Sequence, residues 1–83
     1  MQITLTLPML EALERATDKP DWLVERLARL RTEGEPFLLA LRNQESTALE
    51  ELCAMNIRFD REGIVLPEHR PLDQLSLLVM QNY

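Results

Sequence analysis

The apolar residues change their repeat within the first thirty positions, and this change restricts the chain to a mixed architecture. In QITLTL (2–7), apolar and polar residues alternate, which is the period of a strand with one buried face. Over 20–33, Leu23, Leu27 and Leu30 recur at helical spacing, which predicts an amphipathic helix. A chain that holds both periods needs a core shared between a sheet and helices, so we expect an α+β fold.

Further elements are predicted by the prolines and glycines between the apolar segments. Pro8 suits the first turn of a helix, and we expect a first helix over about 8–17. Asp18 is the expected cap of the helix over 20–33, and Gly34 follows the last turn of that helix as an ordinary stop signal.

In three later segments the spacing of apolar residues is less regular. Residues 36–42 are a short apolar run that fits a buried strand or a helical turn, and we favour a strand. Thr47 with Glu50 fits a capping box and predicts a third helix over 46–56. The leucine-rich segment 71–83 begins with a proline and is assigned as a helix, although its apolar residues also alternate as in a strand.

Residues 56–73 contain IRFD, REG and IVLP in succession, which predicts a β-hairpin with Gly63 in a left-handed position of its turn. At 83 residues the chain encloses one core, so we expect a single domain over 1–83. The expected architecture is a small, mostly antiparallel sheet made of the N-terminal strand, a middle strand and the hairpin. Three to four helices would pack on one face of this sheet.

A helix followed by a hairpin is also how winged-helix DNA-binding domains end. The charges oppose that interpretation, because the helix over 46–56 carries Glu50 and Glu51 and no basic residue. The hairpin segment 56–73 has three arginines against four acidic residues, and the whole chain has a net charge of −5. Phosphate contacts need basic side chains along the contact face, so nucleic acid is disfavoured as a partner. Acidic and basic residues are interspersed, which also disfavours mimicry of DNA.

Residue types that carry chemistry are scarce. The only histidine, His69, lies in a proline-bounded connection, and the only cysteine, Cys53, shares a helical face with Leu49 and Leu52. One histidine and one cysteine do not complete a zinc site, and two glycines do not build a phosphate-binding loop. We therefore expect no catalytic residue, no metal site and no cofactor, and we do not expect an enzyme.

The chain also lacks signals for export or membrane insertion. Its start, MQITLTLP, has no basic region and no long apolar core, and its longest apolar stretch, 75–80, is too short to cross a bilayer. A single cysteine allows no internal disulfide. We expect a cytoplasmic protein with no membrane association.

Two groups of residues are candidate contacts for a partner protein. Trp22, Arg26 and Arg29 lie at helical spacing on the side of the 20–33 helix opposite its leucines, and tryptophan and arginine are typical of binding hot spots. Alternatively, Trp22 folds back against the first helix and fills the angle between the two.

The C-terminal segment is apolar on nearly all sides, and its candidate contacts are Leu75, Leu78 and Met80. Either this segment is a central core element, or its outer side meets a partner or a second copy of the chain.

These observations favour a small acidic protein–protein interaction module, such as an adaptor, inhibitor, antitoxin or chaperone-like subunit, which could form a homodimer. The alternative is a winged-helix-like regulator that binds nucleic acid. A third hypothesis is a non-catalytic subunit of an enzyme complex.

Overall fold

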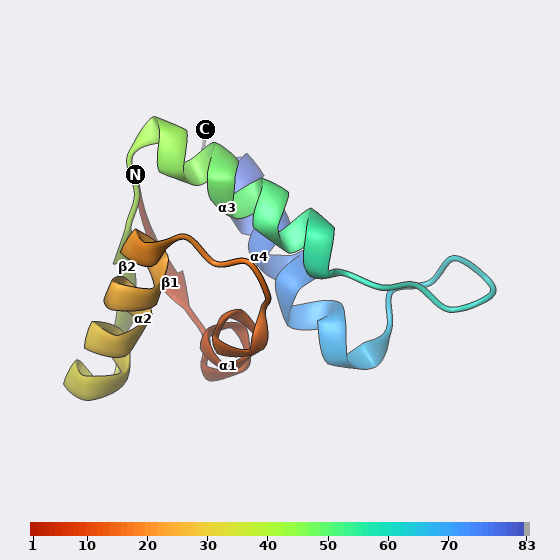
Figure 1. Cartoon of the computed structure of the whole chain (residues 1–83), viewed down its shortest axis with the longest axis horizontal. Coiled ribbons are helices and arrows are strands. Elements are labelled where there is room, and N and C mark those ends of the chain that lie inside the picture. Colours follow the sequence, from red (N-terminus) through yellow and green to blue (C-terminus); the bar gives the residue numbers. More distant parts are fainter. Residues whose placement is uncertain (83) are drawn as a thin grey trace.

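The computed structural model describes residues 1–82 and contains two strands and four α-helices (Figure 1). In chain order these are β1 (Gln2–Leu5), α1 (Leu7–Arg15), α2 (Asp21–Glu33), β2 (Phe37–Ala40), α3 (Asn43–Asn56), the 3₁₀ turn η1 (Pro67–His69) and α4 (Arg70–Gln81). The α+β class predicted from the sequence is confirmed.

The sheet consists of β1 and β2, which pair antiparallel with Ile3 opposite Leu39 and Leu5 opposite Phe37. These four side chains are buried, whereas the residues between them are exposed. Successive side chains of a strand point to opposite faces, so the helices cover one face of the sheet and leave the other open. This arrangement agrees with the prediction that the helices pack on one face.

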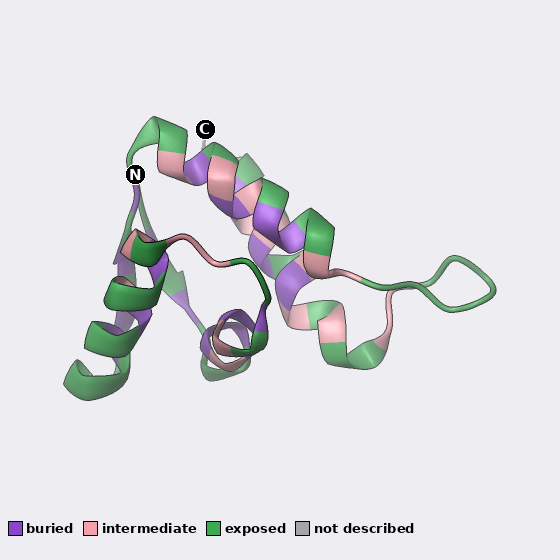
Figure 2. Cartoon of the chain, in the orientation of Figure 1, coloured by how far each residue is buried: buried purple, intermediate pink, exposed green. Residues whose placement is uncertain are grey.

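The core lies between this sheet and the four helices, and all six elements contribute to it (Figure 2). α3 and α4 pack along each other, and α4 also contacts α1 and β1. The largest side chains that are fully enclosed come from every helix and from β2: Leu10, Leu13, Leu23, Leu39, Leu49, Leu75 and Val79.

The first strand is shorter than the predicted range 2–7. It ends at Leu5 because Thr6 caps α1: its hydroxyl oxygen accepts a hydrogen bond from the Met9 backbone N–H at 3.3 Å. Leu7 is therefore helical and 40% exposed, although the alternating pattern assigned it to the strand.

The second helix and the middle strand are confirmed as Asp21–Glu33 and Phe37–Ala40, but the predicted cap of the helix is wrong. Asp18 adopts a left-handed conformation with φ of 61° and turns the chain before the helix. The helix begins instead with the Pro20 carbonyl, which accepts hydrogen bonds from the N–H groups of Leu23 and Val24. Its end is as predicted, with Gly34 at φ 79° and the Gly34 N–H bonded to the Leu30 carbonyl.

The third helix begins at Asn43, three residues before the predicted start. Its first turn is closed by the Glu45 carboxylate, which accepts a hydrogen bond from the Arg42 backbone N–H at 2.8 Å. The predicted capping box of Thr47 and Glu50 is therefore wrong, because both residues lie inside the helix.

The predicted hairpin forms, but it does not join the sheet. A single bridge links Phe59 and Val65, and Gly63 has a φ of 82°, as the predicted turn requires. The turn is held by the Asp60 carboxylate, which accepts hydrogen bonds from the N–H groups of Glu62 and Ile64. The hairpin projects from the helices as an exposed arm (Figures 1 and 2).

The C-terminal segment is a helix, α4, over Arg70–Gln81, which confirms the helical assignment over the strand alternative. The last residue of the predicted range, residue 83, lies outside the described residues. Within residues 1–82, no helix is long and apolar enough to span a membrane.

Candidate functional site

The cluster around Trp22 connects three elements. Arg26 lies one helical turn after Trp22, and its guanidinium carbon is 4.8 Å from the centre of the Trp22 ring, in cation–π contact. The same guanidinium donates two hydrogen bonds to the Glu45 carboxylate, both at 2.8 Å, and one to the Ala40 carbonyl at 3.0 Å. Arg26 thereby ties α2 to the end of β2 and to the first turn of α3.

The ionisation of this pair follows from its hydrogen bonds. The bidentate bond from Arg26, followed by the bond from the Arg42 backbone, lowers the pKa of Glu45, and the bond to Glu45 raises the pKa of Arg26. Both groups are thus held in their charged forms. A second pair, between Arg31 and Glu14, joins α2 to α1 in the same way and lowers the pKa of Glu14.

The predicted group of Trp22, Arg26 and Arg29 is only partly brought together. Trp22 is half-buried and packs against the core, with Arg26 over its ring. Arg26 is occupied by internal contacts, which makes it a positioning residue of the fold. Arg29 is exposed and forms no ion pair within the described part of the chain.

A hollow of about 170 Å³ lies between α2 and β2, and we call it the α2–β2 groove. Its lining residues are Arg26, Arg29, Leu30, Glu33, Leu38, Leu39 and Ala40. No sequence pattern predicts this groove, because it depends on how the helix lies beside the strand.

The C-terminal helix divides its apolar residues between the core and the surface. Leu75 is fully buried in the core, which agrees with the alternative that this segment is a core element, and it presents no exposed surface for the predicted partner contact. Leu78 is half-buried and packs against the core. Met80 is 56% exposed, and Leu77, one turn before it, is 50% exposed. We call Leu77 and Met80 the α4 surface. Leu77 was not among the contacts predicted from the sequence, because apolar residues surround most of this helix.

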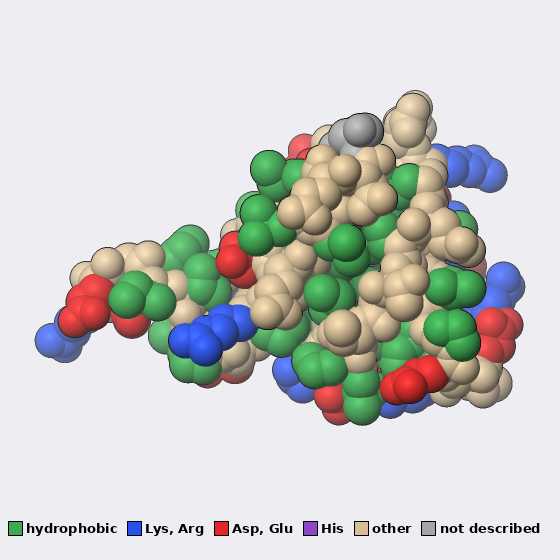
Figure 3. Space-filling model, turned by 180° about the vertical axis from the view of Figure 1, so that it is seen from behind, with side chains coloured by type: hydrophobic (Ala, Val, Ile, Leu, Met, Phe, Trp, Pro, Cys, Tyr) green, Lys and Arg blue, Asp and Glu red, His purple; other side chains and the backbone are tan. Residues whose placement is uncertain are grey.

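The side of the molecule on which β1 and α4 lie carries few charges in its middle (Figures 1 and 3). β1 and α4 lie on the far side in Figure 1, and seen from behind, apolar and uncharged atoms fill the middle of the molecule while charged side chains surround them (Figure 3). The open side of the sheet presents Gln2, Thr4, Leu38 and Ala40, and α4 has no charged residue after Asp73. A surface with few charged residues is typical of the centre of a protein–protein interface.

The hairpin contributes further exposed apolar side chains, since Phe59 is 60% and Ile64 53% exposed. At its base, the Arg58 backbone N–H donates a hydrogen bond to Nδ1 of His69 at 2.9 Å. His69 is half-buried at the end of η1, where this hydrogen bond fixes the orientation of its ring.

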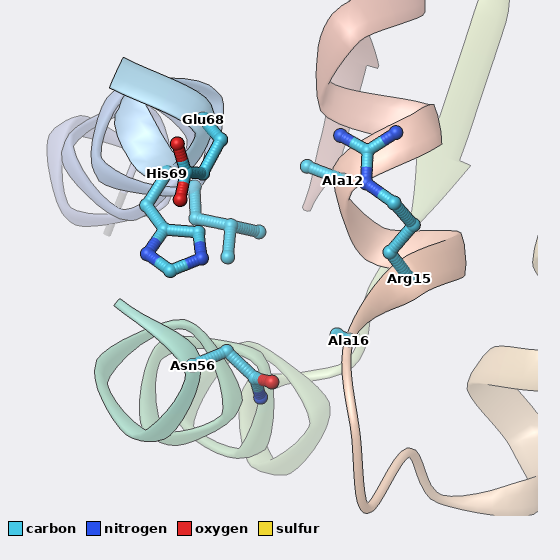
Figure 4. A pocket seen from close by; sticks show the side chains of 7 residues that line it. Ala12, Arg15, Ala16, Asn56, Glu68 and His69 are labelled. Carbon is cyan, nitrogen blue, oxygen red and sulfur yellow. The ribbon is translucent and has the colours of Figure 1, made fainter. Parts of the chain in front are cut away.

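A small hollow of about 80 Å³ lies beside His69, between α1, the end of α3 and the start of α4 (Figure 4). Arg15, Glu68 and His69 supply its charged or titratable groups, and Asn56 forms part of its wall. Asn56 is used structurally, because it exchanges hydrogen bonds with the Thr17 backbone and also donates one to the Leu52 carbonyl. The hollow contains no hydroxyl or thiol nucleophile.

Cys53 is fully buried among the residues of the core, as its position beside Leu49 and Leu52 predicted. Burial, followed by the nearby charge of Glu50, raises the pKa of the Cys53 thiol to about 12. The thiol is therefore protonated at neutral pH and is not a nucleophile there. Among residues 1–82, no group of three or more metal-binding side chains is brought together.

Comparisons with protein families, with curated proteins and with solved structures each found no match to this chain. The exposed surfaces of the chain are therefore the observations that bear on its function.

Proposed function

We propose that this chain is a protein-binding module that docks on another protein through the α4 surface. One observation carries the proposal: Leu77 and Met80 are half-exposed on the outer side of α4, while the inner side of the same helix is enclosed by the chain itself. The helix thus has more apolar surface than its own domain covers. Exposed apolar surface of this kind is typical of sites where proteins meet.

The chemistry of the surroundings supports the proposal. Methionine is flexible and polarizable and adapts to the shape of a partner, which suits Met80 to an interface. Gln74 and Gln81 flank the α4 surface with uncharged polar groups, as expected for the rim of such an interface. The half-buried Leu78 lies between the two exposed residues and holds this part of the helix against the core.

The test is a pair of matched double variants. Leu77→Glu with Met80→Glu places two charges on the α4 surface, and Thr32→Glu with Gln44→Glu places two charges on exposed positions of α2 and α3. Each immobilised variant is exposed to an extract of the cells that produce the protein, and the retained proteins are quantified by isotope-labelled mass spectrometry. We expect the control to retain the partner as the unmodified chain does, and the first variant to lose it by about ten-fold or more.

Circular dichroism and urea unfolding confirm that both variants are folded, which is expected because all four positions are exposed. Retention of the same partner by both double variants would overturn the proposal. So would the absence of any retained partner from the unmodified chain.

A second candidate, a winged-helix-like regulator, is supported by one observation: the hairpin follows α3 and projects from the body (Figure 1). A gel shift with mixed-sequence DNA tests it. Retardation at low salt that weakens steeply as salt rises would favour nucleic acid over a protein partner.

A homodimer is a special case of the proposal, in which the α4 surface meets a second copy. Light scattering after size exclusion measures this directly, with the mass expected to fall to that of the monomer in the Leu77→Glu, Met80→Glu variant.

A further inference from the structure

The outer edge of β2 presents backbone groups that the sheet does not use. Met1 and Leu41 exchange both of their backbone hydrogen bonds, each at 2.8 Å, just beyond the paired strands. In an antiparallel ladder such pairs alternate with pairs that have no mutual hydrogen bonds. The register therefore directs the N–H and C=O groups of Leu38 and Ala40 away from β1.

Two of these four groups are occupied within the chain. The Ala40 carbonyl accepts the hydrogen bond from Arg26, and the Leu38 N–H donates to the Pro36 carbonyl at 3.1 Å. The Leu38 carbonyl and the Ala40 N–H have no partner among residues 1–82. When a strand pairs in parallel, one of its residues donates its N–H to a carbonyl of the neighbouring strand. The carbonyl of the same residue accepts from the N–H that lies two residues further along the neighbouring strand. The two free groups thus match a strand that runs parallel to β2.

These groups lie where Leu38 and Ala40 line the α2–β2 groove. α2 forms the other wall, and the short connection between the two elements makes them run in opposite directions. Arg26 consequently lies near the end of β2, as its bond to Ala40 shows, and Glu33 lies near the start of the strand.

The charges of the groove differ between its two ends. Glu33 lies near the start of β2, while Arg29 lies on the wall one turn closer to the end of the strand. Arg29 is exposed and its charge is not matched by any ion pair in the described chain. Arg42, also exposed, lies two residues after the end of β2. An acidic group is therefore favoured toward the end of β2 and disfavoured toward its start.

We propose that the α2–β2 groove binds an extended peptide segment of another protein, which adds to β2 as a parallel strand. Its backbone pairs with the Leu38 carbonyl and the Ala40 N–H, and an acidic side chain or the C-terminal carboxylate meets Arg29. Main-chain pairing at a strand edge supplies affinity in such complexes, and the flanking side chains supply specificity. This site is separate from the α4 surface and does not depend on it.

The experiment uses a library of random seven-residue peptides displayed with free C-termini, selected against the whole chain. We expect the enriched peptides to place an acidic group against Arg29. This group is either an acidic side chain close to the C-terminal end of the peptide or the terminal carboxylate itself. Binding of the most enriched peptide, carrying a fluorescent label, is then measured by fluorescence polarisation.

Two variants test the geometry. Ala40→Pro removes the free N–H, and proline is tolerated where the N–H of an edge strand points outward, so the chain is expected to fold and lose binding. Arg29→Glu is expected to weaken binding by about ten-fold, because an attractive contact at the surface becomes a repulsive one. Arg61→Glu makes the same charge change in the hairpin turn and is expected to leave binding unchanged.

The proposal is overturned if the selection yields no binder, or if Arg29→Glu and Arg61→Glu bind the peptide equally well. It is also overturned if the Leu77→Glu, Met80→Glu variant loses peptide binding while Arg29→Glu keeps it, because the peptide then occupies the α4 surface. Failure of the α4 surface in the extract experiment leaves the expected peptide binding unchanged, so the two proposals are tested separately.

Discussion

Leu75 and Leu77 are the same residue type two positions apart on one helix, and the fold predicts opposite consequences of truncating them. Leu75 is fully buried and Leu77 is 50% exposed. Removing a buried leucine side chain to alanine costs about 2–5 kcal/mol, from lost burial and the cavity that is left. For Leu75→Ala we take a value of about 3 kcal/mol, which is about a 150-fold change in the ratio of folded to unfolded chain.

This loss is a large part of the total stability. A chain of 83 residues has an unfolding free energy on the order of 4–12 kcal/mol, at about 0.05–0.15 kcal/mol per residue. Leu77→Ala, in contrast, is expected to change stability by no more than about 0.5 kcal/mol, as for other surface positions. The fold therefore predicts a difference of about 2.5 kcal/mol between the two truncations.

The assay is urea unfolding of the two variants, followed in parallel by far-UV circular dichroism and by the fluorescence of the half-buried Trp22. Leu78→Ala, at a half-buried position, should fall between them. Equal losses at positions 75 and 77, or a larger loss at position 77, would show that α4 is rotated about its axis relative to the core and that the α4 surface is misassigned.

Two further predictions concern titratable groups. Glu14 and Glu45 have lowered pKa values because Arg31 and Arg26 bind them, so the unfolded chain takes up protons at a higher pH than the folded chain. Their stabilising contribution is present above the ordinary carboxyl pKa of 4.5 and is lost as the pH falls below it. The urea midpoint of the unmodified chain should therefore drop between pH 5 and pH 3. Glu45→Gln should lower the midpoint at pH 7 and make its drop with pH smaller. An unchanged drop in Glu45→Gln would contradict the assignment. Cys53, with a pKa of about 12, should react with a disulfide reagent at pH 8 at least about 1,000-fold more slowly in the folded chain than in urea, and similar rates would show that the thiol is accessible.

Sequence patterns predicted the elements whose signal lies in local chemistry. The helix over Asp21–Glu33 and the strand Phe37–Ala40 were found because leucine spacing and the Gly34 stop act within a few residues. The boundaries that failed depend on competing caps. Thr6 caps α1, so this helix begins where the alternating pattern predicted the end of the strand. Glu45 closes the first turn of α3, so this helix begins before the position predicted from Thr47.

The hairpin shows a different limit. Its turn was predicted from Gly63, but its position outside the sheet is a tertiary property: the sheet ends with two strands, and the arm projects away from them. An alternating pattern specifies pairing within a hairpin and not the neighbour beyond it.

For the candidate contacts, sequence spacing placed the residues on helices but did not separate the enclosed side chains from the exposed ones. Arg26 was chosen as a surface residue, but the approach of β2 and α3 engages it with Ala40 and Glu45. On α4 the apolar residues cover so much of the circumference that spacing did not separate the enclosed Leu75 from the exposed Leu77. Only the packing of α4 on α1, α3 and β1 makes that division.

Photo-crosslinking inside the producing cells shows whether the outer side of α4 meets a partner protein. Benzoylphenylalanine replaces Leu77 in one variant and the exposed Thr32 of α2 in another, and both are irradiated under the same conditions. We expect a discrete adduct of higher mass from position 77 and none from position 32. Adducts of equal yield at both positions, or no adduct at position 77, would rule out a partner on this side of α4.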